Sequence, residues 1–245
     1  MVIATSAAWS SGAMAAEGNK PAWGYEGSKG PGEWAKLSPD FAACESGRQQ
    51  SPIDLASAEK PGSPVSVAID YKPLPLTILH NGHTVEVVIE NGSTMTLDGK
   101  AFELLQFHFH TPSEHTAGGK RFDAEVHFVH RSADGQLAVI GVFLENGAAN
   151  PTLAKVIAHT PPQKAAAQTF ANTVINPRDI LPALTQFWVY DGSLTTPPCS
   201  EGVRWMVERV TAPMSQEHID VLSKAMGANA RPIQPINDRQ VVAPN

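Results

Sequence analysis

Short β-branched runs dominate the chain from Tyr71 onward and predict a succession of strands. The runs at 84–90 and 93–97 are joined by Asn91-Gly92, a pair typical of two-residue turns, so a β-hairpin is predicted there. Further strands are predicted at 74–79, 102–110, 123–130, 136–144, 186–190 and 203–210. The pattern therefore predicts a protein dominated by sheet.

Two short helices are predicted at the periphery of this sheet. Asn150-Pro151 provides an N-cap and a first-turn proline for one helix, and Ser215 caps another that ends at Gly227. Residues 21–65, by contrast, are rich in Gly, Pro and Ser and show little periodicity. We expect them to wrap the surface or to cover an edge of the core.

The composition is that of a globular protein. Apolar residues make up 42% and charged residues 17% of the 245, which excludes a disordered segment, a collagen-like fibre and a coiled coil. The net charge is −6 and no basic run is longer than Lys120-Arg121, so no nucleic-acid partner is expected. No run of about 18 apolar residues occurs, so no transmembrane helix is expected.

The N-terminal residues differ in character from the rest. Residues 1–17 are small and weakly apolar, and Ala13-Met14-Ala15 fits the small-x-small rule for signal cleavage, although a basic n-region is missing. A signal-peptide remnant is predicted for 1–17, with a disordered N-terminus as the alternative. No repeat or break in composition follows residue 20, so residues 18–245 are expected to form one domain.

The two cysteines, Cys44 and Cys199, lie far apart in the chain. They cannot form a CxxC site, and two cysteines alone cannot build a structural zinc centre. The count alone leaves two buried free thiols open. An even pair in a chain with a possible export signal instead favours one disulfide.

Polar and aromatic residues alternate along one predicted strand. Side chains two positions apart share a strand face, so Gln106, His108 and His110 project together. The next strand carries His127, and a hairpin centred on Gly118-Gly119 would place it opposite His110 and one step from His108. Three imidazoles would then meet on one face of the sheet.

Three converging imidazoles suit a divalent transition metal, with zinc first, and leave the fourth tetrahedral position open as in a catalytic site. His130 has the opposite parity to His127 and is expected to point away, as a surface or packing residue. Glu125 shares the face of His127 and is placed to accept an imidazole N–H, with a solvated carboxylate as the alternative. Gln106 is expected to orient one of the other two histidines.

Longer motifs follow one another from about Trp23 to Arg239, over nearly the whole chain. They are Trp23-Gly24-Tyr25, Gln50-Ser51-Pro52-Ile53, Asn81-Gly82-His83, Gln106-Phe107-His108-Phe109-His110, Ser113-Glu114-His115, Glu125-Val126-His127-Phe128-Val129-His130 and Gly192-Ser193-Leu194-Thr195-Thr196-Pro197-Pro198. In these motifs and their order the chain resembles the α-class carbonic anhydrases of the secreted or periplasmic bacterial type.

The resemblance implies a mainly β (α+β) single domain with a large, twisted, mostly antiparallel central sheet and short peripheral helices. It implies that His108, His110 and His127 bind Zn²⁺, and that zinc-bound hydroxide attacks CO2 to give bicarbonate and a proton. The expected enzyme is a carbonic anhydrase (carbonate dehydratase), a zinc lyase, with ester hydrolysis as a side activity.

The resemblance also identifies an active-site loop. Thr195 would accept a hydrogen bond from the zinc-bound hydroxide only if it donates its own single proton, and Glu114 is the family's acceptor. Thr196 would contact bicarbonate or inhibitors. Without the resemblance, Thr195-Thr196-Pro197-Pro198 would be interpreted only as a rigid turn.

Carbon dioxide is small and apolar, so its site must be a hydrophobic niche beside the metal. The resemblance implies a niche lined by four residues that would otherwise be ordinary core: Val129, Val139, Leu194 and Trp205. Near the mouth, His83 matches the family's proton shuttle, because an imidazole titrates near neutrality. Asn81 and Tyr25 match residues that order the intervening waters, whereas a solvated loop histidine is the alternative for His83.

Location and partners follow from the same resemblance. The Cys44–Cys199 pair matches the disulfide of secreted bacterial members, which implies a periplasmic or secreted protein. The implied partner is a small-molecule substrate, CO2 or bicarbonate, with no nucleic acid and no membrane. A homodimer is a further expectation, although no residue marks its interface.

Two other functions remain open at the level of sequence. A catalytically silent, carbonic-anhydrase-like binding domain would typically have lost a zinc histidine, and all three are present here. An unrelated metal-binding barrel with an HxH pair, such as a cupin, would require a carboxylate ligand soon after the histidine pair. Glu114 lies at a suitable spacing from His110. That fold would leave the threonine loop without a role.

Overall fold

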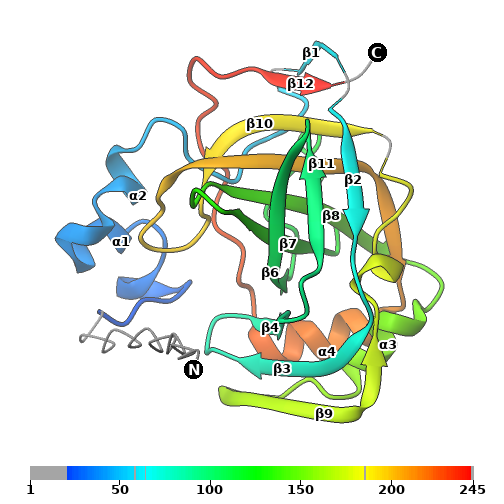
Figure 1. The fold of residues 1–245 in the computed structure, drawn as a ribbon. Coiled ribbons are helices and arrows are strands. Elements are labelled where there is room, and N and C mark those ends of the chain that lie inside the picture. Colours follow the sequence, from blue (N-terminus) through cyan, green and yellow to red (C-terminus); the bar gives the residue numbers. More distant parts are fainter. Residues whose placement is uncertain (1–20, 58, 64, 185, 244–245) are drawn as a thin grey trace, which may run out of the picture.

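A large twisted sheet forms the centre of the molecule, and short helices lie around it (Figure 1). The computed structural model describes residues 21–57, 59–63, 65–184 and 186–243. The signal-peptide remnant predicted at 1–17 therefore lies outside the described residues. No helix in the described part is long and apolar enough to cross a membrane.

Twelve strands of the described residues belong to this sheet. They are β1 Glu59–Pro61, β2 Val67–Asp70, β3 Leu74–His80, β4 Val85–Val88, β5 Thr94–Leu97, β6 Lys100–His110, β7 Ala124–Ser132, β8 Leu137–Asn146, β9 Ala165–Ile175, β10 Phe187–Ser193, β11 Glu201–Met214 and β12 Val241–Ala243. The order across the sheet is β1-β12-β10-β11-β8-β7-β6-β4-β3-β9, and β5 pairs with β2 and β6. Only β8–β11 and β1–β12 are parallel among these pairs, which confirms the mostly antiparallel sheet.

The helices are few and short, as predicted. They are α1 Trp34–Leu37, α2 Ala43–Ser46, α3 Pro151–Ile157 and α4 Gln216–Met226, with 3-10 turns η1 Gly27–Lys29, η2 Pro39–Phe41 and η3 Pro177–Ile180. Asn150 caps α3 by accepting hydrogen bonds from two backbone N–H groups, and Ser215 caps α4. Gly227, which ends α4, has φ 68°, a conformation that glycine adopts without strain. Both predicted helix boundaries are thus confirmed by their caps.

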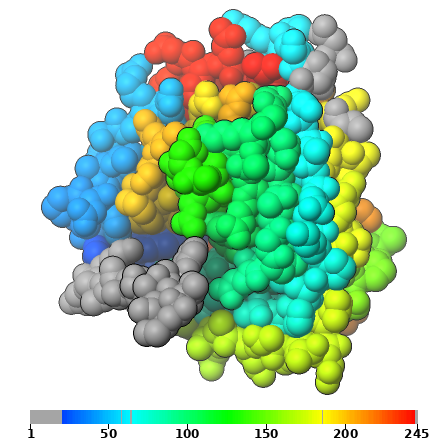
Figure 2. Space-filling view, in the orientation of Figure 1, coloured from blue at the N-terminus to red at the C-terminus, as the bar shows by residue number. Residues whose placement is uncertain are grey.

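The helices lie at two places around the sheet. The helices α1 and α2 lie on one side of the molecule, whereas α3 and α4 pack together near β9 and β4 (Figure 1). The strand β9 forms an outer rim of the molecule in the space-filling view as well (Figure 2).

The hairpin predicted at Asn91-Gly92 does not form, and that prediction was wrong. The two strands beside it, β4 and β5, both pair with the long β6, β4 opposite residues 106–108 and β5 opposite 100–103. They therefore lie end to end along one partner rather than against each other. The Asn91 side chain donates a hydrogen bond to the Lys72 carbonyl and so holds the turn to a third segment.

The period of two along the strands separates two cores on opposite faces of the sheet. On β7 and β8, Phe128 and Ile140 belong to the larger apolar cluster. Their neighbours Val129 and Val139 belong with Trp205 to a smaller cluster on the other face. The second face is the one that also carries the candidate metal ligands.

Candidate metal centre

The strands β6 and β7 carry the three candidate ligands. Their pairing register differs by two residues from the predicted register. His108 pairs with His127, and His110 pairs with Glu125. A hairpin centred on Gly118-Gly119 would instead have placed His110 opposite His127, so the predicted pairing was wrong. The connecting segment makes bridges of its own and is not a simple hairpin. A shift of two residues preserves parity, so the three rings still share one face.

The three imidazoles converge. One nitrogen of each of His108, His110 and His127 lies within 4.8 Å of the others. His110 and His127 are buried, and His108 is half-buried beside the cavity. Desolvation, together with the neighbouring rings, lowers the pKa of His108 well below its usual value, and desolvation also lowers the pKa of His110. Both rings are therefore neutral at pH 7 and have a lone pair for a metal.

The other nitrogen of each ring is hydrogen-bonded to a neighbour. These contacts are His108 Nδ1 to Gln106 Oε1 at 2.8 Å, His110 Nδ1 to the Asn229 carbonyl oxygen at 2.9 Å, and His127 Nε2 to Glu125 Oε1 at 2.9 Å. Each partner is an acceptor, so it fixes the N–H on that nitrogen and leaves the opposite nitrogen as a bare acceptor. The contacts expected of Gln106 and Glu125 are present, and Asn229 is a partner that the sequence did not indicate.

The bare nitrogens fit a zinc ion. Within the described part of the chain, His110 Nε2 is buried without a hydrogen-bond partner. Glu114 Oε2 lies 3.4 Å away, and it is likewise buried and unpaired. Two unpaired acceptors in contact are costly unless a cation lies near them. Three convergent imidazoles are a donor set typical of catalytic zinc.

Glu125 is a buried carboxylate rather than a solvated one. It accepts hydrogen bonds from the backbone N–H groups of Glu114 and His115, both at 2.9 Å, and from the rings of His115 and His127. Burial alone would raise its pKa, but the two histidines hold the pKa of Glu125 well below its usual range. An ionised Glu125 therefore orients His127.

His115 is the functional neighbour that the sequence analysis missed. Its Nδ1 contacts Glu125 Oε1 at 2.8 Å, and its Nε2 contacts the Tyr190 hydroxyl at 2.6 Å. Atoms of His115, Glu125 and His127 also lie within 4.8 Å of one another, but hydrogen bonds already join them, so this group is a network rather than a second metal site. Only its place beside Glu114 in a quoted motif could have suggested a role.

Thr195 and Glu114 are both buried at the site. Glu114 Oε1 accepts from the Arg231 backbone N–H at 2.9 Å. The expected hydrogen bond from Thr195 to Glu114 is not formed between these two described residues, because Glu114 Oε2 faces His110 instead. Thr196 lines the cavity beside the metal ligands.

The four niche residues come together in one part of the sheet. Val129 pairs with Val139, and Val139 pairs with Trp205 on the next strand. The Trp205 ring meets the His127 ring edge-on, with centroids 4.9 Å apart. Leu194 packs against the same apolar cluster. An apolar wall therefore adjoins one ligand.

A cavity of about 120 Å³ opens onto the ligands. Its lining is Trp23, Tyr25, Asn81, His83, Thr84, Glu86, Gln106, His108, His110 and Thr196. A larger surface cleft, about 720 Å³, contains none of the predicted site residues. The smaller cavity thus joins the proposed shuttle, His83, to two ligands.

The His83 ring is stacked on Trp23, with centroids 3.6 Å apart and an interplanar angle of 7°. Desolvation, Lys164 and His80 lower the pKa of His83. Burial and Glu114 raise the pKa of Tyr25 well above its usual value, so its hydroxyl remains protonated. Trp23 lies in the Trp23-Gly24-Tyr25 motif, but no role was predicted for it.

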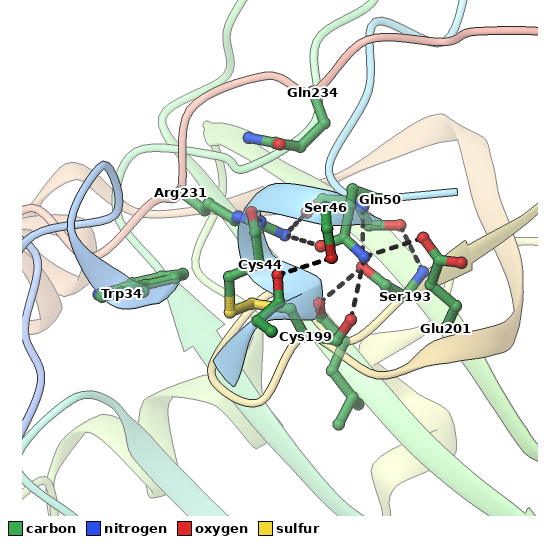
Figure 3. The surroundings of a disulfide bond; sticks show 12 residues. Trp34, Cys44, Ser46, Gln50, Ser193, Cys199, Glu201, Arg231 and Gln234 are labelled. Atoms are coloured by element: carbon green, nitrogen blue, oxygen red, sulfur yellow. Dashed lines mark hydrogen bonds between the residues drawn. A yellow bond between two sulfur atoms is a disulfide. The ribbon is translucent and has the colours of Figure 1, made fainter. Parts of the chain in front are cut away.

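A disulfide joins Cys44 to Cys199, which excludes two free thiols (Figure 3). Figure 3 shows polar side chains around it, of which Gln50 and Arg231 are buried. Arg231 donates to the Cys44 carbonyl at 2.8 Å, and Gln50 donates to the Cys199 carbonyl at 3.0 Å. The bond therefore ties α2 to the loop that carries Thr195 and Thr196.

Comparisons with known proteins show what the whole chain is similar to. The family described as eukaryotic-type carbonic anhydrase matches residues 29–245. The carbonic anhydrase of Nostoc sp. is 45% identical over 90% of this chain and 85% of its own length, and that of Pectobacterium atrosepticum is 44% identical over 90% of each. The solved α-carbonic anhydrase of Thermovibrio ammonificans, in complex with the inhibitor sulfanilamide, has a TM-score of 0.83 at 44% identity. It covers 91% of this chain and 99% of that one.

Proposed function

Because the chain belongs to the eukaryotic-type carbonic anhydrase family, whose zinc-dependent lyases hydrate carbon dioxide, we propose that His108, His110 and His127 hold the zinc ion of this enzyme. The reaction is the reversible conversion of CO2 and water to bicarbonate and a proton. The observation that carries the proposal is the set of three convergent ring nitrogens, one of them buried without a partner. A catalytically silent binding domain would have no need of this complete donor set.

Bound zinc would supply the Lewis acid that activates water near neutral pH, the established role of zinc in carbonic anhydrases. The protein keeps each ring in one tautomer through Gln106, the Asn229 carbonyl and Glu125. Neutral imidazoles add no negative charge to the ion, so its pull on electrons is reduced less than carboxylate ligands would reduce it. The hydrogen-bond partners thus orient the rings, and the neutral rings leave the positive charge of the ion largely undiminished.

Orientation of the attacking water is the role proposed for Thr195 and Glu114. Among the described residues Glu114 Oε2 has no hydrogen-bond partner, so it is free to accept a hydrogen bond from the Thr195 hydroxyl. The threonine has only one proton to donate, so its oxygen could then only accept a hydrogen bond from the attacking water. Thr196 lines the cavity and is placed to contact bicarbonate. CO2 would lie against the apolar wall of Val139 and Trp205, because an apolar molecule needs no hydrogen bond from its site.

His83 is proposed to carry the released proton to solvent. His83 and His108 line the same cavity, and Asn81 and Tyr25 line it too, where they would order water. Desolvation lowers the pKa of His83, so the ring is neutral at pH 7 and its free nitrogen can accept a proton. The His83 ring would alternate between two positions, one stacked on Trp23 and one rotated toward the metal ligands.

The test is CO2 hydration by the zinc-loaded enzyme, with and without a chelator, followed by the variant His83→Ala. Chelation should abolish activity. The variant should lower kcat in weak buffer by about tenfold or more while kcat/KM stays unchanged, because only proton transfer is affected. Added imidazole should restore kcat. The control variant His159→Ala, which removes a histidine remote from the cavity, should leave both kcat and kcat/KM unchanged. An equal fall in kcat/KM without imidazole rescue would reject the shuttle.

We also propose a periplasmic or secreted location. The support is the Cys44–Cys199 disulfide, since such bonds persist in oxidising compartments. Thiol titration in denaturant, on periplasmic material kept non-reduced, should find no free cysteine. Two free thiols would contradict the proposal.

A further inference from the structure

The turn that presents His83 joins β3 to β4 and is short. His80, the last residue of β3, pairs with Val85, the first of β4. Gly82 has φ 98°, a conformation that favours glycine. The turn leaves backbone groups that the β3–β4 ladder does not pair, and their partners decide how firmly His83 is held.

Side chains fix the backbone of His83. Its N–H donates to Asn81 Oδ1 at 2.9 Å, and its carbonyl accepts from Asn229 Nδ2 at 3.0 Å. The His83 ring, by contrast, makes no hydrogen bond with any described residue and is held only by its stack on Trp23. The backbone is thus held by hydrogen bonds on both sides, whereas the ring is held by stacking alone.

His80 anchors the turn from the other side. Its Nδ1 accepts from the Gly82 N–H at 3.0 Å, and its Nε2 donates to the Ala225 carbonyl at 2.9 Å in the last turn of α4. One neutral tautomer, with the proton on Nε2, satisfies both contacts at once. The ring is 4% exposed, so it is a buried link between the turn and α4.

Asn229 connects the same turn to the metal ligands. It is fully buried and donates from Nδ2 to the carbonyls of His83 and Phe109, both at 3.0 Å, while Oδ1 accepts from the Thr111 N–H at 2.8 Å. Its own backbone carbonyl accepts from His110 Nδ1. One residue therefore spans the shuttle turn and the end of β6 that carries His110.

From these contacts we infer that His80 and Asn229 are positioning residues for the proton shuttle. They hold the backbone of His83 at a fixed place relative to the metal ligands, so that only side-chain torsions carry the ring between Trp23 and the cavity. Proton transfer through ordered water needs a defined donor–acceptor separation, which a mobile turn would not provide. The inference rests on the shuttle role proposed above.

The first test is His80→Leu, which keeps an apolar side chain and removes both contacts. We expect kcat in weak buffer to fall by roughly tenfold, with kcat/KM unchanged and with rescue by imidazole. His80→Asn, which keeps an acceptor near the Gly82 N–H, should restore part of the loss. His159→Leu, which removes a histidine that does not contact the turn, should leave both constants unchanged.

The decisive measurement is the double variant His80→Leu/His83→Ala. If His80 acts through His83, the double variant should have the kcat of His83→Ala alone. Falls that add, or a matching fall in kcat/KM, would overturn the inference. If His83→Ala alone leaves kcat unchanged, the shuttle itself fails, and the two failures are distinguishable.

Asn229→Ala provides a second test that does not depend on how well His80→Leu folds. The variant keeps the backbone carbonyl that holds His110, so zinc content should remain at about one ion per chain. Its kcat in weak buffer should fall as in His80→Leu, again with no further fall on the His83→Ala background. Loss of zinc, or a kcat equal to that of the unmodified enzyme, would remove Asn229 from the inference.

Discussion

A histidine has two ring nitrogens, and in this chain their contacts separate the ligands from the packing histidines. Each candidate ligand has one nitrogen bonded to a neighbour and the other directed at the shared point. In His130, on the opposite face, Nδ1 donates to the Ala138 carbonyl and Nε2 accepts from the Tyr71 hydroxyl. His130 thus points away as its parity predicted, but it is buried packing rather than surface.

Zinc content should distinguish these two classes of histidine. Replacing His108, His110 or His127 with Ala removes a ligand, so zinc affinity should fall by more than the roughly 10–100-fold typical of losing a partner of a ligand. Activity should be lost with the metal. His130→Gln should retain zinc at about the wild-type ratio, as measured by metal analysis after dialysis. A zinc-free His130→Gln would contradict the assignment of faces.

His130 should also make the protein less stable in acid. Burial lowers the pKa of His130 to about 4. An unfolded histidine titrates near ~6.5, so the unfolded state binds more protons between these values. The contribution of the neutral His130 to the free energy of unfolding should therefore be fully present above about pH 6.5. It should decrease as the pH falls to about 4, by roughly 3 kcal/mol in total.

Urea unfolding at several pH values would measure this effect as the difference between the wild type and His130→Gln. The difference should shrink toward acid pH, because the glutamine does not titrate. Parallel pH dependences in the two proteins would show that His130 is not the group responsible.

At the scale of elements, register and face behave differently. The β6–β7 register differs by two residues from the predicted one, yet His108, His110 and His127 still share a face because the side-chain period is two. A slip of one residue would have moved His127 to the apolar side and destroyed the site. The caps of α3 and α4, in contrast, are local features and occur where they were predicted.

The α4 cap can be tested alone. Ser215 Oγ accepts the His218 N–H at 3.4 Å, and the Ser215 carbonyl accepts the same N–H at 3.0 Å. Ser215→Ala removes the side-chain part of this shared hydrogen bond and should lower the free energy of unfolding by about 0.5 kcal/mol, the low end for a lost N-cap. Ser215→Asp, which restores an acceptor and places a negative charge at the helix N-terminus, should recover most of it. Denaturant midpoints measure both. No change in Ser215→Ala would mean that the Ser215 carbonyl alone satisfies the His218 N–H.

At the scale of the whole molecule, the disulfide connects distant parts of the chain. Cys44 and Cys199 are separated by 155 positions, and the bond joins the N-terminal segment to the active-site loop. The Arg231 guanidinium links the same segment to Gln50 and lies over the Trp34 ring, so this corner of the molecule is held by both covalent and polar contacts.

Reduction of the disulfide should destabilise the whole fold. If loop entropy dominates, opening a loop of this length should lower the free energy of unfolding by up to ~5 kcal/mol. The double variant Cys44→Ser/Cys199→Ser measures the same loss without a reductant. Urea midpoints with and without reductant should differ for the wild type and coincide for the double variant. A wild-type midpoint that reductant leaves unchanged would contradict the expectation.

The sequence by itself determined which side chains share a face and where the capped helices begin. Those properties depend on periodicity, caps and residue identity within a few positions. Only the tertiary structure decided that β4 and β5 both pair with β6, that His115 supports Glu125, and that His80 and Asn229 hold the turn of His83. The strand β9, neutral and exposed along most of its length, also lacked a pattern to predict it. The physical reason is that backbone hydrogen-bonding groups are alike at nearly every residue, so the choice of partner depends on segments far away in the chain.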